Sequence, residues 1–178
     1  MYEQLNQVVR EMTAPKQMFE IRETEVAGQV LKTWALAPPS LRELWLSTAG
    51  HSDKDYMVYQ DERWTYNEAH DEVARIAGWL TANGVRQHDR VAIAMRNYPE
   101  WMLTYWALAS IGAVSVGVNA WWVAEELRYG LEDSEVCMII CDRERLARFA
   151  EVRNQLPGVR AVAVRTDDIP EWATPWAE

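Results

Sequence analysis

The sequence predicts an α/β fold, in which an open, mostly parallel sheet carries helices on both faces, with a short hairpin and an irregular amino-terminal arm. Beyond residue 90, short runs rich in Val, Ile and Ala alternate four times with segments of helical periodicity. The connections between these segments are short, which favours parallel strands joined by right-handed crossover helices. Of the 178 residues, 49% are apolar, so the chain can bury one compact core.

The composition excludes several classes of partner. The formal net charge is −9 and the pI is near 4.9, and an acidic surface repels both nucleic acid and anionic membranes. The longest apolar stretch, residues 101–118, contains hydroxyl groups and changes character at Gly112. We interpret it as a helix followed by a strand and expect no membrane span. Two cysteines and the lack of a signal-peptide pattern predict a reducing, cytoplasmic location.

The first part of the chain predicts an arm. Residues 1–38 begin with apolar side chains at helical spacing, namely Leu5, Val8, Val9 and Met12. A polar, extended stretch follows. Ser40 and Glu43 have the form of a capping box, which predicts a short helix that ends near Ala49. Residues 55–66 have the pattern of two short strands around a polar turn, which predicts a hairpin.

Two helices have clear end signals. Thr65 and Glu68 repeat the capping-box pattern, and an apolar stripe then continues as far as Gly84. The second helix is predicted to be capped by Asn97, to have a proline in its first turn and to end at Gly112. Its side chains are nearly all apolar, so we expect this helix to be mostly buried.

The remaining elements alternate up to residue 164. We expect strands over residues 90–95, 114–118, 136–141 and 159–164, and helices over 125–131 and 143–155. From Arg165 the chain has little periodicity and the composition of a linker. The predicted organisation is therefore an arm (1–38), an α/β subdomain (39–164) and a linker (165–178).

Common catalytic and metal motifs are missing from the sequence. There is no G-x-G-x-x-G turn, no phosphate-binding loop ending in Gly-Lys-Ser/Thr and no serine elbow between glycines. His51, His70 and His88 are far apart and are expected at the surface, so we predict no metal site. Cys137 and Cys141 lack further zinc ligands and are expected to pack in the core, on the same face of a strand.

An ordered series of motifs resembles a known family. Trp64-Thr65-Tyr66-Asn67-Glu68 looks like the Thr-Tyr-x-Glu opening of acyl-CoA and aryl-CoA synthetases. Further matches follow in order: Gly84-Val85, His88-Asp89-Arg90-Val91-Ala92-Ile93, Asn97-Tyr98-Pro99-Glu100-Trp101, Gly112-Ala113-Val114, Asn119, Glu125-Glu126-Leu127, Leu131-Glu132-Asp133-Ser134 and Ile139-Ile140-Cys141-Asp142. The chain is thus similar to the amino-terminal part of an acyl-CoA synthetase of the AMP-binding, adenylate-forming superfamily. Asn119-Ala120-Trp121-Trp122 looks most like bacterial fatty-acid or related acyl-CoA ligases.

The resemblance implies a carboxylate–CoA ligase as the parent protein. Such an enzyme uses ATP and magnesium to convert a carboxylic acid, expected to be a fatty acid, into an acyl adenylate, and then transfers the acyl group to CoA. The family's phosphate loop, ribose-binding aspartate and late catalytic lysine have no counterpart in these residues. We therefore expect no catalytic residue here and no activity from the chain alone.

Two groups of residues are candidate binding residues. Arg143, Arg145 and Arg148 follow a strand end, where the resemblance implies contacts to CoA phosphates. The alternative is an ordinary helix surface on which Glu144 pairs with Arg148. For Trp121 and Trp122 the choice is between lining an acyl pocket and burying a loop against the rest of the synthetase.

Alternative functions remain open at this stage. The chain could be a ligase segment whose partner is the remainder of the same synthetase, or a free-standing interaction module that self-associates through an exposed apolar surface. The DNA beyond codon 178 would distinguish these two. An independent nucleotide-binding domain is a third reading, which requires ATP or CoA to raise the melting temperature; we expect no rise at millimolar ligand. We also expect a homo-oligomer, and the acyl substrate is left open.

Overall fold

The computed structural model describes residues 2–176, and the contacts within it divide the chain into two units, Met1–Ser40 and Leu41–Glu178. The first unit contains helix α1 (Tyr2–Met12) and an antiparallel hairpin of β1 (Ile21–Val26) and β2 (Gln29–Trp34). The apolar residues at helical spacing in the arm therefore do lie in a helix, α1. The stretch expected to be irregular and extended instead forms this hairpin, whose turn at Ala27 and Gly28 has positive φ at both residues.

The second unit begins with helical segments and a hairpin that precede the sheet. Its elements are α2 (Leu41–Ser47), the 3-10 turn η1 (Thr48–His51), β3 (Asp55–Tyr59), β4 (Glu62–Thr65), α3 (Tyr66–Ala82), β5 (Arg90–Ala94), α4 (Pro99–Ile111), β6 (Val114–Gly117), α5 (Ala124–Asp133), β7 (Met138–Asp142), α6 (Arg143–Val152), the 3-10 turn η2 (Arg153–Gln155), β8 (Arg160–Val164) and β9 (Ala173–Pro175). Strands β3 and β4 form the predicted antiparallel hairpin.

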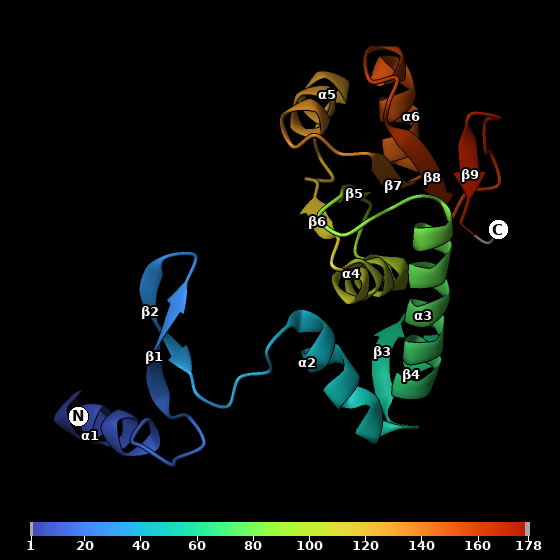
Figure 1. Ribbon diagram of the computed structural model, residues 1–178. Coiled ribbons are helices and arrows are strands. Elements are labelled where there is room, and N and C mark those ends of the chain that lie inside the picture. The colour runs from blue at the N-terminus through green and yellow to red at the C-terminus, as the bar shows by residue number, and fades with distance from the viewer. Residues whose placement is uncertain (1, 177–178) are drawn as a thin grey trace. The chain divides into compact units, whose positions relative to one another are not determined.

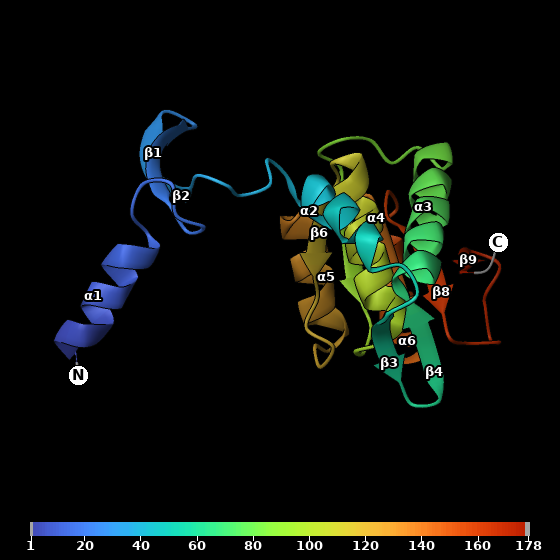
Figure 2. The same cartoon turned by 90° about the horizontal axis from the view of Figure 1, so that it is seen from below.

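The main sheet has five parallel strands in the order β6-β5-β7-β8-β9. Helices α3 and α4 cover one face and α5 and α6 cover the other, as Figure 1 shows. On the first face, α4 packs against both α2 and α3 (Figures 1 and 2). The predicted fold class is confirmed, since the sheet is open and parallel and both of its faces are covered.

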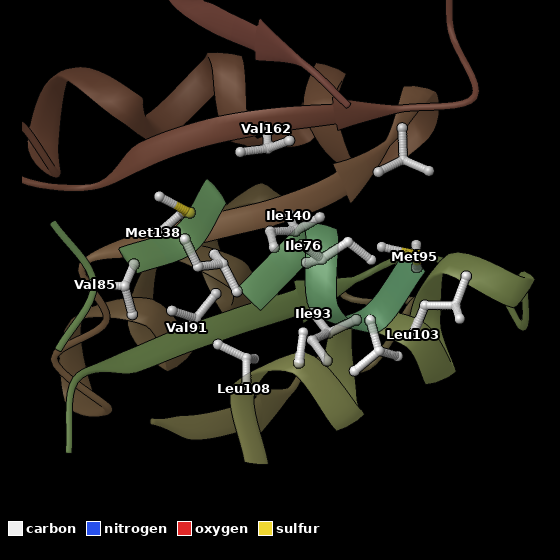
Figure 3. Packing of buried hydrophobic residues seen from close by; sticks show 14 of the residues in the cluster. Ile76, Val85, Val91, Ile93, Met95, Leu103, Leu108, Met138, Ile140 and Val162 are labelled. Atoms are coloured by element: carbon white, nitrogen blue, oxygen red, sulfur yellow. The ribbon is translucent and has the colours of Figure 1, made fainter. Parts of the chain in front are cut away.

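The core consists of two layers, one on each face of the sheet. Alternate strand residues such as Ile93 and Ile140 point toward α3 and α4, where they meet Ile76, Leu103 and Leu108 (Figure 3). The intervening strand residues face α5 and α6 and are mostly small; they are Ala92, Ala94, Ile139, Cys141, Ala161 and Ala163. Small side chains leave room for the large residues of the covering helices, because protein interiors are close-packed.

Local sequence signals explain where the main helices begin and end. The side chain of Thr65 accepts a hydrogen bond from the Glu68 N–H and the Glu68 carboxylate accepts one from the Thr65 N–H, which completes the predicted capping box of α3. Helix α4 ends at Gly112, which has φ +72° as a left-handed C-cap requires. The prediction that Asn97 caps this helix was wrong. The helix begins at Pro99, so the N-cap is Tyr98, whose side chain makes no capping hydrogen bond.

Two further expectations differ from the structure. The stretch beyond Arg165, expected to be a linker, contains β9, which adds to the sheet beside β8. A proline is tolerated there because β9 is an edge strand. Cys137 and Cys141 do not share a face: Cys141 packs beneath α5 and α6, whereas Cys137 precedes β7 and packs against the opposite layer. Both thiols are free, and burial raises the pKa of Cys141 far above its ordinary value.

Candidate functional site

The strand order reverses direction between β5 and β7. The connection from β5 leads through α4 to β6, whereas the connection from β7 leads through α6 to β8 on the opposite side. Open α/β sheets bind ligands outside the carboxyl ends of the strands at such a switch point. The loops after β5, β6 and β7 meet at the carboxyl ends of the strands, which we call the carboxyl edge of the sheet. There the backbone N–H of Arg96 donates a 3.0 Å hydrogen bond to Asp142 Oδ2.

Asp142 and Arg145 form a buried ion pair beside the switch point. Arg145 Nη1 lies 2.9 Å from Asp142 Oδ2, and the two side chains are only 2% and 5% exposed. Asp142 also caps α6 by accepting a hydrogen bond from the Arg145 N–H at 3.1 Å. A buried carboxylate needs such partners, because leaving it unpaired in the interior is costly.

The same arginine fixes the loop that joins β6 to α5. Arg145 Nε donates to the carbonyl oxygen of Ala120 at 2.8 Å, and its Nη2 donates to the same oxygen. Arg148 Nη1 adds hydrogen bonds to the carbonyl oxygens of Ala120 and Trp122, each at 2.8 Å. We refer to Asp142, Arg145, Arg148 and the carbonyl of Ala120 as the loop latch.

The three arginines predicted to contact CoA therefore occupy different environments. Arg143 is exposed and borders an open groove of about 390 Å³ that is also lined by Trp172 and Asp168. Arg145 is buried in the loop latch, and Arg148 is half-buried there. The alternative interpretation also needs correction, because the Glu144 carboxylate pairs with Arg145 at 3.1 Å and not with Arg148.

The two tryptophans of the loop have opposite orientations. Trp121 is 70% exposed, and the Arg96 guanidinium lies over its ring at 5.1 Å from the centroid. Trp122 is half-buried and packs on Gly130 of α5, where a Cβ would come within 2.5 Å of the indole. Of the two candidate substrate-binding residues, Trp121 alone presents its ring to the outside of this unit.

A second cluster at this edge was missed by sequence reasoning. Arg165, just after β8, pairs with Glu62 at 2.8 Å and Glu100 at 2.9 Å, and its guanidinium lies 5.1 Å from the ring centroids of both Tyr59 and Tyr98. The hydrogen bond from Arg165 lowers the pKa of Glu62. The cluster ties the β3–β4 hairpin to α4 and β8, so its role is structural. No short-range pattern connects residues so far apart in sequence.

The histidines and acidic residues do not gather into a metal site. Within residues 2–176, no group of three or more His, Cys, Asp or Glu side chains is arranged to hold a metal ion. His51 and His88 are exposed as predicted, whereas His70 is half-buried, stacks on Trp45 at 4.1 Å and hydrogen-bonds Thr48 Oγ1 at 3.0 Å. Among the described helices, none is long and apolar enough to cross a membrane.

Fold and edge geometry together define an open parallel α/β domain of the type whose ligand sites lie at a switch point. Residues 44–178 match the AMP-binding enzyme family, and the chain belongs to this family. Its fold is that of the amino-terminal subdomain of the adenylate-forming ligases.

Individual relatives agree with this assignment. The chain is 29% identical over 120 residues to the crotonobetaine/carnitine–CoA ligase of Salmonella paratyphi B, and the match covers 64% of this chain but 23% of the relative. A putative long-chain-fatty-acid CoA ligase from Rhodopseudomonas palustris superimposes with a TM-score of 0.72 at 26% identity, over 80% of this chain and 36% of that one. The NpsA N-terminal subdomain from Klebsiella oxytoca shares the fold, with a TM-score of 0.55 at 23% identity over 57% of this chain and 27% of that one.

Proposed function

We propose that this chain is the amino-terminal frame of a carboxylate–CoA ligase. The parent enzyme would activate a carboxylic acid, with a fatty acid as the expected class, by joining it to ATP as an acyl adenylate, and would then transfer the acyl group to CoA. The single observation that carries the proposal is the family match over residues 44–178, on a sheet whose switch-point edge is exposed. The chain spans about a quarter of the length of the curated relatives, at 23%.

The frame itself is proposed to lack catalysis. ATP, magnesium and CoA would be the cofactors of the parent enzyme, and no magnesium ligand is proposed within residues 2–176. Stabilising the charge that develops during adenylyl transfer requires a metal, cations or oriented amides around the phosphates. The sequence contains none of the family's phosphate-loop residues. A cytoplasmic location, where ATP and CoA are available to a protein with free thiols, fits this role.

Within the arginine cluster, we assign the CoA contact to Arg143. Its side chain is exposed and lies beside a groove with an aromatic wall, so it can approach a phosphate without breaking an existing hydrogen bond. Arg145 and Arg148 already donate to Asp142, Ala120 and Trp122, and their proposed role is to hold the loop. Arg143→Gln should weaken CoA binding in the parent enzyme. Glu151→Gln, an exposed substitution on the same helix that does not touch the groove, serves as the control.

A split-enzyme assay tests the proposed function. The 178-residue chain would be mixed with the carboxyl-terminal remainder of a related CoA ligase, together with ATP, magnesium, CoA and a panel of carboxylic acids. We expect acyl-CoA thioester only when both pieces are present. Thioester from the chain alone would contradict the proposal, as would stable assembly of the two pieces with no activity on any acid. Circular dichroism of each piece establishes that both are folded.

Association is the second part of the proposal. We propose that the exposed apolar side chains of the amino-terminal unit pack against the remainder of the same synthetase or against a second copy. The side chains that support this proposal include Tyr2, Leu5, Val8, Val9, Met12, Phe19 and Trp34, all of which are exposed. So many exposed apolar side chains in a unit of about 40 residues support an interaction site, because isolated exposed apolar residues are ordinary whereas large apolar patches mark interfaces.

A further inference from the structure

We propose that Arg96 and Trp121 together form an oxyanion-binding pair at the switch point. The Arg96 guanidinium would bind a carboxylate or phosphate group, and the Trp121 ring would contact the planar or apolar body that carries it. The inference rests on the proposed function in one respect, since a carboxylate–CoA ligase handles ligands of both kinds. It adds a specific site that consists only of residues of this chain.

The Arg96 side chain has unused hydrogen-bonding capacity. Three other arginines near this edge are engaged: Arg145 and Arg165 by carboxylates, and Arg148 by backbone carbonyls. Arg143 is exposed as well, but it borders the separate groove beside Trp172. Among residues 2–176, the Arg96 guanidinium forms no hydrogen bond or ion pair; it lies over the Trp121 ring, and the side chain is exposed. A guanidinium has five N–H donors in a planar fork that matches the two oxygens of a carboxylate or phosphate.

The backbones of both partners are held in place by hydrogen bonds. The backbone of Arg96 is fixed by its hydrogen bond to Asp142, whose other partner is the buried Arg145. The loop latch fixes the Ala120 carbonyl, and the Trp121 N–H donates to Asn119 Oδ1 at 3.0 Å. The exposed indole is thus attached to an anchored loop. A surface that is ordered before binding loses less entropy when the ligand arrives.

The charged side chains around Arg96 are mostly paired with one another. The loops and first helical turns that flank the switch point carry Arg96, Arg143, Arg145 and Arg148 and the carboxylates of Glu100, Glu125, Glu126, Asp142 and Glu144. Glu100 pairs with Arg165, and Glu125 pairs with Arg128. Asp142 is already neutralised by Arg145, and Glu144 lies 3.1 Å from the same guanidinium. Arg96, by contrast, has no carboxylate partner among residues 2–176, so its charge is available to an anion although the chain has a formal net charge of −9.

The test is a titration of the 178-residue chain, labelled with ¹⁵N at the tryptophan indoles and followed by NMR. Trp121→Phe assigns the Trp121 indole signal as the one that disappears. The probes are benzoate and adenosine monophosphate, each with its uncharged counterpart, benzamide or adenosine. We expect the Trp121 signal to shift saturably with at least one anion, with a Kd on the order of 10 mM, and not with the uncharged counterparts. This affinity is too weak to raise the melting temperature at about 1 mM ligand.

Variants decide whether Arg96 is responsible. Arg96→Gln should weaken the response about fivefold or more while leaving the ligand-free Trp121 signal sharp. Arg90→Gln, which removes an exposed arginine at the opposite end of β5, should leave the response unchanged. A response to benzoate identifies the acid substrate as the source of the oxyanion, and a response to adenosine monophosphate identifies the nucleotide. The inference is overturned by equal shifts with the uncharged counterparts, by unaltered binding in Arg96→Gln, or by no shift at all. Thioester formation in the split-enzyme assay is a separate readout, so either proposal can fail alone.

Discussion

At the scale of single residues, the Asp142–Arg145 pair connects the sheet, α6 and the loop after β6. Asp142 accepts hydrogen bonds from the backbone N–H of Arg96 and from the side chain of Arg145. Arg145 also donates a hydrogen bond to the carbonyl oxygen of Ala120. Both side chains are almost completely buried. Breaking a buried pair leaves an uncompensated charge, and the cost is much larger than the net value of the intact pair.

Replacing Arg145 with Met should therefore be strongly destabilising. We expect the free energy of unfolding to fall by about 3–5 kcal/mol, because the buried Asp142 loses its main partner. Urea denaturation followed by circular dichroism measures the change. Arg143→Met, on the exposed side of the same helix, is the control and should change stability by less than about 0.5 kcal/mol. Equal effects of the two substitutions would refute the structural role of Arg145.

His70 should make stability depend on pH. Burial beside Trp45 lowers the pKa of His70 from its ordinary value of 6.5, because the charged ring loses hydration. The folded state then binds the proton less tightly than the unfolded state. Stability is complete above pH 6.5 and declines as the pH falls from there through the lowered folded-state pKa. Urea midpoints of wild type and His70→Gln across this range check it: the variant should lose this part of the slope, and the exposed control His51→Gln should keep it.

At the scale of elements, helix ends could be predicted because they depend on nearby residues. The capping box of α3 and the glycine at the end of α4 follow local rules, and both were found in the structure. Strand β9 and the β1–β2 hairpin were not predicted, because neither has a strong pattern of alternating apolar residues. Cys137 is on the unexpected layer because the chain is not yet in the regular strand at that residue.

Replacing two glycines with alanine should change the stability of the protein in opposite directions. Gly112→Ala should destabilise the protein by about 1–2 kcal/mol, because φ is +72° and the new Cβ would lie 3.0 Å from Gln87 Cγ. Gly78→Ala, inside α3 with nothing within 4 Å of its Cβ, should instead stabilise the protein by about 0.5–1 kcal/mol. Thermal and urea unfolding of both variants checks the signs. Stabilisation by Gly112→Ala would be incompatible with a left-handed C-cap.

The candidate site was only partly predictable, because its contacts join residues that are far apart in the sequence. That arginines follow β7 is visible in the sequence, and so is their position at the carboxyl edge. Which of them is buried depends on the Ala120 carbonyl, which lies 25 residues away from Arg145. Arg96 could have been noticed as a cation directly after a strand, but its partner Trp121 comes from another loop. Contacts between loops follow from the strand order, which no local pattern encodes.

At the scale of the whole molecule, the amino-terminal unit lacks a core of its own. None of its described residues is buried, and a unit of about 40 residues is too small to be stable through its own apolar contacts. We expect the 178-residue chain to associate with increasing concentration. Light scattering should show this association, and deletion of residues 1–40 should abolish it. A full-length chain that stays monomeric at high concentration, or a deleted chain that still associates, would contradict the assignment.

We propose that ligands of the parent enzyme approach the carboxyl ends of the strands in this sheet. The most direct measurement is a titration of the ¹⁵N-labelled chain with CoA, with backbone amide shifts mapped onto the structure. We expect the largest shifts just after β5, β6 and β7, at Arg96, Ala120 and Arg143, while amides at the opposite ends of the strands, such as Asp89 and Val136, stay unchanged. Shifts centred on the opposite edge, or spread evenly over the surface, would contradict it.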